Sequence, residues 1–174
     1  MKRIYIFVII FTTSCSFQST QLDLISSIFS KKNDNLELNW VVSWLGAKTD
    51  VYAINNNNYI YFVNYDEYFI EFNGWQITKV NGFLSQDRNI EIISKDEVLT
   101  YLVNNKQLLT LICDSWVRSL PNREGYVTHQ QECFNYDLGY NFTNHIIIND
   151  LGQIISLKYK VHPDYPKIMI NFIS

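Results

Sequence analysis

The fold of this chain is decided by the stretch Tyr68-Phe69-Ile70-Glu71-Phe72-Asn73-Gly74-Trp75-Gln76-Ile77-Thr78-Lys79-Val80. Two runs of mostly apolar residues, Tyr68–Phe72 and Trp75–Val80, stand on either side of the pair Asn73-Gly74. An Asn-Gly pair between two such runs is the strongest short signal of a β-hairpin, because both residues of the tightest turn need a positive φ. The stretch therefore predicts two antiparallel strands joined by a turn at Asn73-Gly74.

The rest of the chain repeats this pattern of short apolar runs and polar turns. The run Asn55–Asn58 and the triplet Asp150-Leu151-Gly152 are turn-prone. Hairpins that follow one another without βα units predict an antiparallel meander. We expect the further strands at Val51–Ile54, Tyr59–Val63, Leu108–Cys113, Val127–Phe134, Phe142–Ile148, Ile154–Val161 and Ile168–Ile173.

Two segments show features of helices. Apolar residues at helical spacing over residues 21–30, behind the candidate N-cap Thr20, predict a short amphipathic helix. Residues 96–104 are a second candidate, although their β-branched and aromatic residues disfavour a helix. The chain has 12 Tyr and 11 Phe and no Pro/Gly-rich linker. We therefore expect one mainly β domain, a curved antiparallel meander that forms an open half-barrel or sandwich-like sheet, with a short N-terminal helix.

The N-terminal residues have the layout of a lipoprotein signal peptide. Met1-Lys2-Arg3 is a positively charged n-region, Ile4–Phe11 is an apolar run, and Thr12-Thr13-Ser14 are small residues in front of Cys15. The apolar run is too short to cross a bilayer, since a membrane helix needs about 20 residues. The sequence predicts a cleaved signal peptide at 1–14, a covalent diacylglycerol and acyl (palmitate) anchor on Cys15, a tether at 15–20 and the β domain at 21–174.

Two details of this segment leave an alternative open and indicate a location. Thr12 stands where bacterial lipoproteins usually have Leu, so an ordinary secretory signal that yields a soluble secreted protein is the alternative. Ser16 follows the cysteine, whereas in enteric bacteria an Asp there commonly retains a lipoprotein at the inner membrane. We therefore expect the protein on the periplasmic face of the outer membrane, with the lipid on Cys15 and no other cofactor.

The charge of the mature chain argues against some partners. Removing residues 1–14 removes Lys2 and Arg3, so 12 basic and 17 acidic residues remain and the net charge is −5. The densest basic pair is Lys31-Lys32. Nucleic acids and anionic membrane surfaces attract clusters of Lys and Arg. We therefore expect no nucleic-acid partner, and membrane attachment through the lipid.

Two cysteines remain besides Cys15. In an oxidising compartment, Cys113 and Cys133 would most simply form one disulfide. Two buried free thiols are an alternative, and a metal pair is another. His129 precedes Cys133 by four residues, but the sequence offers no complete set of four ligands. We expect no metal.

No sequence pattern indicates catalysis. The chain has no nucleophile elbow, zinc-protease motif or P-loop. Its histidines are scattered, at His129, His145 and His162. Asp114 and Arg118 could line a polar site, but they are better interpreted as surface groups beside the disulfide. We expect no enzymatic activity and no catalytic residue.

The tryptophans offer a binding feature. Trp40 and Trp44 lie in an apolar stretch and are expected in the core. Trp75 directly follows the predicted turn and is the candidate for an exposed, ligand-facing aromatic side chain.

Three segments together carry a resemblance to a known family. Residues 21–29 form the predicted helix behind the lipidated cysteine, residues 72–83 form the first hairpin, and residues 141–156 form a late hairpin that leads to His162-Pro163. They resemble the YjbF/GfcB family of lipoproteins, which are encoded with exopolysaccharide and group 4 capsule export genes. The matching positions in the first hairpin are Asn73, Gly74, Ile77, Lys79 and Gly82. The chain departs from the family at Trp75, where a small or basic residue is common, and at residues 64–68.

The resemblance implies a strongly curved, largely antiparallel sheet with helices at one side, and no catalytic residue. It implies an outer-membrane lipoprotein that assists exopolysaccharide or capsule secretion by binding polysaccharide or partners in the export machinery. The alternative is a carrier or acceptor of lipid or lipoprotein, with an apolar concave sheet. The interior distinguishes the two: a cavity lined by Trp40, Trp44, Phe62 and Tyr68 favours the carrier, and a filled core with Trp75 outside favours binding.

Overall fold

The computed structural model describes residues 39–173 except 57, 67 and 85–88. These residues belong to one compact unit, Glu37–Ser174, which is distinct from Met1–Leu36. Within the described ranges there are strands and no helix. The strands are β1 (Trp40–Trp44), β2 (Ala47–Asn56), β3 (Tyr59–Val63), β4 (Phe69–Phe72), β5 (Ile77–Asn81), β6 (Asn89–Lys95), β7 (Val98–Val103), β8 (Lys106–Cys113), β9 (Val117–Arg118), β10 (Val127–Asn135), β11 (Tyr140–Ile148), β12 (Ile154–Tyr159) and β13 (Ile168–Phe172). The predicted signal peptide, Cys15, the tether and the helix at 21–30 lie outside the described residues.

Tight turns between successive strands explain why the chain folds as a meander. Three of these turns have two central residues that both adopt a positive φ: Leu45-Gly46, Asp96-Glu97 and Asn104-Asn105. Such turns match the right-handed twist of the strands that they join. The helix considered at 96–104 is therefore wrong. Asp96-Glu97 turns the chain back after β6, and β7 follows with Leu99 and Tyr101 buried and their neighbours more exposed.

The hairpin predicted at residues 68–80 is present as β4 and β5, with one difference in its turn. The Asn73 N–H donates to the Gln76 carbonyl at 2.9 Å, so the central residues are Gly74 and Trp75. Only Gly74 has a positive φ, 93°, which is the pattern of a turn with glycine in its first central position. Trp75 consequently lies at the tip of the turn and not at the start of β5.

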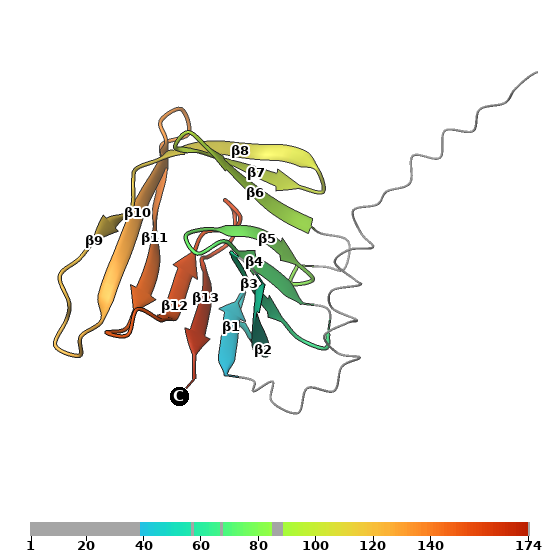
Figure 1. Ribbon diagram of the computed structural model, residues 1–174. Helices are drawn as coiled ribbons and strands as arrows, with labels where there is room; N and C mark the ends of the chain where they lie inside the picture. Colours follow the sequence, from blue (N-terminus) through green and yellow to red (C-terminus); the bar gives the residue numbers. More distant parts are fainter. Residues whose placement is uncertain (1–38, 57, 67, 85–88, 174) are drawn as a thin grey trace, which may run out of the picture. The chain divides into compact units, whose positions relative to one another are not determined.

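The sheet closes on itself. All neighbouring strands pair antiparallel in one sheet, as predicted. β10 pairs with β11 along its whole length and also with β8, so every strand except β9 belongs to a closed ring (Figure 1). The expected open half-barrel is thus corrected to a closed barrel. The sequence pattern predicts hairpins between consecutive strands. It does not predict the pairings of β8 with β10 and of β1 with β13, which close the ring, because these strands are not consecutive.

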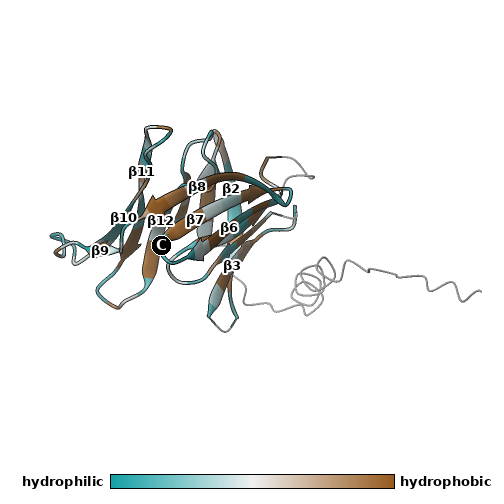
Figure 2. Ribbon diagram, turned by 90° about the horizontal axis from the view of Figure 1, so that it is seen from above, coloured by the Kyte–Doolittle hydropathy of each residue, from teal (hydrophilic) through white to brown (hydrophobic). Residues whose placement is uncertain are grey.

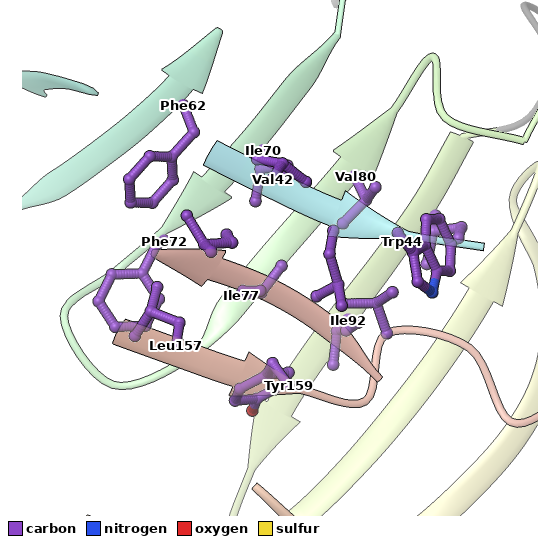
Figure 3. Packing of buried hydrophobic residues seen from close by; sticks show 14 of the residues in the cluster. Val42, Trp44, Phe62, Ile70, Phe72, Ile77, Val80, Ile92, Leu157 and Tyr159 are labelled. Atoms are coloured by element: carbon purple, nitrogen blue, oxygen red, sulfur yellow. The ribbon is translucent and has the colours of Figure 1, made fainter. Parts of the chain in front are cut away.

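The interior of the ring is filled by apolar side chains from alternate positions of the strands. Val42, Phe62, Ile70, Leu157 and Tyr159 are at most 1% exposed and belong to one cluster. Figure 3 shows side chains of β1 and β12 packed against those of β3, β4 and β5. Hydrophobic residues run along the strands, and hydrophilic residues occupy many connecting turns (Figure 2).

Candidate functional site

The predicted disulfide is present and lies where the ring closes. Cys113 ends β8 and faces Cys133 of β10, with the sulfur atoms 2.04 Å apart and the Cα atoms 4.0 Å apart. Both side chains are buried. The alternatives of free thiols and a metal pair are thereby excluded for these two residues.

Few backbone contacts accompany the disulfide in joining β8 to β10. The register pairs just Cys113 with Cys133 and Ile112 with Phe134. The Asp114 N–H donates to the Glu132 carbonyl at 2.8 Å, and the Asn135 side-chain amide donates to the Thr110 carbonyl at 2.9 Å. We call this junction the seam. The disulfide is its covalent part.

The clearest candidate for a binding surface gathers three aromatic rings from distant parts of the chain. Trp75 is 47% exposed. Its ring centroid lies 5.8 Å from that of Trp116 and 5.2 Å from that of His129. These residues come from the β4–β5 turn, the β8–β9 connection and β10, and we call them the aromatic platform. The prediction that Trp75 is exposed is thus met, and two further rings surround it.

The turn that carries Trp75 is held firmly. The Asn73 side-chain oxygen accepts hydrogen bonds from the backbone N–H groups of Trp75 at 3.1 Å and Gln76 at 2.8 Å. The Gln76 side chain is buried and donates to the Ile92 carbonyl of β6 at 3.3 Å. Trp116 is half-buried and packs against the core. The indole of Trp75 is therefore presented by an ordered turn, which reduces the entropy lost on binding.

A surface groove of about 560 Å³ adjoins the platform and shares His129 with it. Arg118 of β9 lies opposite His129 in the register. The groove is lined by Arg118, Pro121, Gly125, Val127, His129, Ile148, Asn149, Asp150 and Gly152. A guanidinium that donates hydrogen bonds and a carboxylate that accepts them thus lie in one groove beside an exposed indole. This combination suits a ligand with apolar faces and many hydroxyl groups.

Other residues considered from the sequence lie elsewhere. Asp114 lines a separate pocket of about 480 Å³ beside the disulfide, together with Glu132 and Tyr136, so it does not join Arg118. In the described part of the chain, no three or more His, Cys, Asp or Glu side chains form a group that could hold a metal ion.

The predicted core aromatics contact one another. Trp44 and Phe62 are buried, and Trp40 packs against the same core. Ring centroids lie 5.1 Å apart for Trp40 and Phe62. They lie 4.5 Å apart for Tyr68 and Phe83, and Phe83 in turn lies 6.1 Å from Trp44. These rings therefore pack against one another and against the core.

Over the described residues, the fold and the platform define one antiparallel β unit with an exposed aromatic cluster. Among solved structures, it is similar to the crystal structure of the hypothetical lipoprotein YmcC from Escherichia coli (K12), with a TM-score of 0.57 and 9% sequence identity. The similarity covers 87% of this chain and 96% of that one. At this identity, what the two share is the fold. No protein-family model matches the chain, and no curated protein matches it in sequence.

No helix in the described ranges is long and apolar enough to span a membrane.

Sequence reasoning singled out Trp75 but not its two partners. Trp116, like the other tryptophans, could stack on a sugar ring if exposed, and His129 is one of three scattered histidines, but no pattern in the sequence places either beside Trp75. The nearest usable signal is the predicted disulfide, because joining Cys113 to Cys133 brings both segments to one place. Nothing in the sequence indicated that the β4–β5 turn reaches them.

Proposed function

We propose that this protein is a non-enzymatic lipoprotein, anchored through Cys15 to the periplasmic face of the outer membrane. It assists exopolysaccharide or capsule secretion by binding the polysaccharide or a partner in the export machinery. The signal-peptide pattern before Cys15 and the family resemblance support this proposal. The fold shared with a hypothetical lipoprotein is consistent with it.

The observation that carries the proposal is the aromatic platform beside its polar groove. The C–H faces of a pyranose ring pack on exposed aromatic rings, and its hydroxyl groups need donors and acceptors at the rim. Trp75 offers the ring. Arg118 and Asp150 offer a donor and an acceptor in the adjoining groove.

The packing of the interior favours this role over that of a lipid carrier. A carrier needs a cavity of several hundred Å³ that takes up most of its ligand. Here Trp40 packs on Phe62, and Trp44 packs on Phe83. The two grooves described above are lined mostly by exposed and half-buried residues.

The anchor is tested by replacing the acceptor of the lipid. Cys15→Ser should move the protein from the membrane fraction to the soluble fraction and abolish labelling by a palmitate analogue. Stable anchoring requires more than one acyl chain, so loss of the thiol removes it altogether. Ser16→Ala is the matched control and should stay in the membrane fraction. Retention of Cys15→Ser in membranes would refute the lipoprotein assignment.

The platform is tested by binding to exopolysaccharide purified from cells that carry this protein. Trp75→Ala should weaken binding about tenfold, because it removes one stacked ring and its buried apolar area. Its melting temperature should fall by only a few degrees, because Trp75 is 47% exposed and its buried part packs on Trp116 and His129. Tyr136→Ala, at an aromatic residue that is 79% exposed outside the platform, is the control. Equal binding by both variants would refute the platform.

A further inference from the structure

Basic residues that are scattered in the sequence lie together on the outer face of the sheet. The cross-strand register forms an unbroken line: Lys48 of β2 faces Ser43 of β1, Ser43 faces Met169 of β13, Met169 faces Lys158 of β12, and Lys158 faces His145 of β11. Lys167 directly precedes β13. We call Lys48, Lys158 and Lys167 the lysine row.

Alternation along the strands places this line on the outside. Val42, Leu157 and Ile170 are buried in the core at 0 to 1% exposure. Their neighbours along each strand point to the opposite face. The strands concerned lie side by side in Figure 1. Since adjacent strands are about 4.8 Å apart, the line from β2 to β11 spans on the order of 19 Å.

Two ammonium groups at this surface are held in place by backbone carbonyls. The Lys167 Nζ donates to the Thr143 carbonyl, and the Lys160 Nζ donates to the Tyr165 carbonyl. Burial lowers the pKa of Lys167, and Lys158 and Lys160 lower it further. Lys160 and Lys167 are thus half-buried, whereas Lys48 and Lys158 are exposed.

The acidic groups nearby are few. Asp164 acts on Lys160 and partly offsets the effect of burial on its pKa. Asp50 follows Lys48 by two residues on the same face of β2. For Lys167, the charged neighbours that affect its pKa are both lysines. A bound anion would relieve this repulsion.

A groove lies between two members of the lysine row. It has a volume of about 280 Å³, and its lining includes Lys48, Lys167, Ser43 and Met169. The Trp44 indole N–H donates to the Pro166 carbonyl at 2.7 Å, which fixes the segment that carries Lys167. The Lys48 and Lys167 side chains therefore line one formed concavity.

We propose that the lysine row binds the acidic groups of an anionic polysaccharide, as a second contact surface beside the aromatic platform. This inference rests on the proposed function and names the class of polysaccharide. A chain with a negative charge on successive sugar rings can contact both Lys48 and Lys158, which lie three strand spacings, or about 14 Å, apart. An anionic membrane surface attracts flexible, solvated lysines. Lys48 and Lys158 are exposed, but Lys167 is half-buried and bonded to a carbonyl, which gives the row one fixed cation.

The experiment compares two sugars of equal length on the full mature protein. Oligogalacturonate carries a carboxylate on every ring, and a neutral glucose oligomer carries none. Lys48→Gln/Lys158→Gln should weaken oligogalacturonate binding about tenfold or more, because two charge-assisted contacts are lost. Its salt dependence should also decrease. Lys106→Gln, at an exposed lysine of the β7–β8 hairpin, should bind as the unchanged protein does.

Each other outcome overturns the inference in a distinguishable way. If both sugars bind equally and only Trp75→Ala weakens them, the lysine row has no such role and the proposed function stands. If neither sugar binds and the exopolysaccharide does not bind either, polysaccharide binding fails as well. If vesicles containing phosphatidylglycerol bind through Lys48 and Lys158 while oligogalacturonate does not, the surface belongs to the membrane. Both lysines are exposed, so the double variant should fold normally.

Discussion

Two tyrosines of the core have the same burial but different surroundings for their hydroxyl groups. Tyr101 and Tyr159 are each at most 1% exposed. The Tyr101 hydroxyl donates to the Lys160 carbonyl at 3.0 Å. The Tyr159 hydroxyl has no hydrogen-bond partner among the residues that the structure describes, and burial raises its pKa strongly. The two residues should therefore respond in opposite ways to loss of the hydroxyl.

Replacement by phenylalanine tests this difference. Tyr101→Phe should lower the free energy of unfolding by about 1 kcal/mol, because it leaves a carbonyl without its donor. Tyr159→Phe should leave it unchanged or raise it by up to about 1 kcal/mol, since an unpaired buried hydroxyl is removed. Urea denaturation measures both. A larger loss for Tyr159→Phe than for Tyr101→Phe would show that the Tyr159 hydroxyl is satisfied.

His145 should make stability depend on pH. Burial lowers its pKa, and Lys167 and Lys158 lower it further. As the pH falls below the unfolded value of about 6.5, the unfolded chain takes up a proton that the folded protein resists. Stability should therefore decrease from about pH 7 to 5. His145→Gln should flatten this part of the profile measured by urea denaturation, and an unchanged slope would contradict the assignment.

At the scale of elements, strands flanked by recognisable turns were predictable, and strands joined by unusual turns were not. The positions of β3, β8, β11 and β13 follow the predicted ranges closely. β6 and β7 were missed because their turn, Asp96-Glu97, uses two non-glycine residues at positive φ. A positive φ is unfavourable for Asp96 and Glu97 by itself, so the pairing of β6 with β7 must stabilise this turn.

The β4–β5 turn is the element that positions the platform, and Gly74 is its critical residue. A Cβ atom at Gly74 would meet nothing within 4 Å, so substitution costs only backbone conformation at its φ of 93°. Gly74→Ala should lower the free energy of unfolding by about 1–2 kcal/mol. Gly74→Asn should cost less, because Asn tolerates positive φ better. Equal urea midpoints for all three proteins would contradict this account.

The candidate site was only partly predictable, because sequence patterns are local and the site joins distant segments. Exposure of Trp75 follows from its place beside a turn. Its contacts with Trp116 and His129 join parts of the chain that lie far apart in sequence, and so does the line from Lys48 to His145. Hydrophobic periodicity reports which face of a strand is buried, but not which distant strand lies beside it.

At the scale of the whole described unit, stability depends on closing the seam. The disulfide links residues that are 20 apart in sequence. Replacing both cysteines with serine should lower the free energy of unfolding by about 3 kcal/mol. Hydrogen exchange should then accelerate in β8 and β10 before it does in β3 and β4. Reduction of the unchanged protein should reproduce the effect, and equal stability of the two proteins would show that the seam holds without the bond.

On the proposed secretory route, the disulfide of the seam would form only after the chain has crossed the membrane. Before oxidation, two register pairs and a few hydrogen bonds hold β8 to β10. A reducing compartment keeps the cysteines as thiols, and an oxidising one joins them. A chain that must pass through a narrow secretion channel would benefit from this order. The chain would remain easy to unfold in the compartment where it is synthesised. The disulfide would then stabilise the folded state in the compartment where the protein functions.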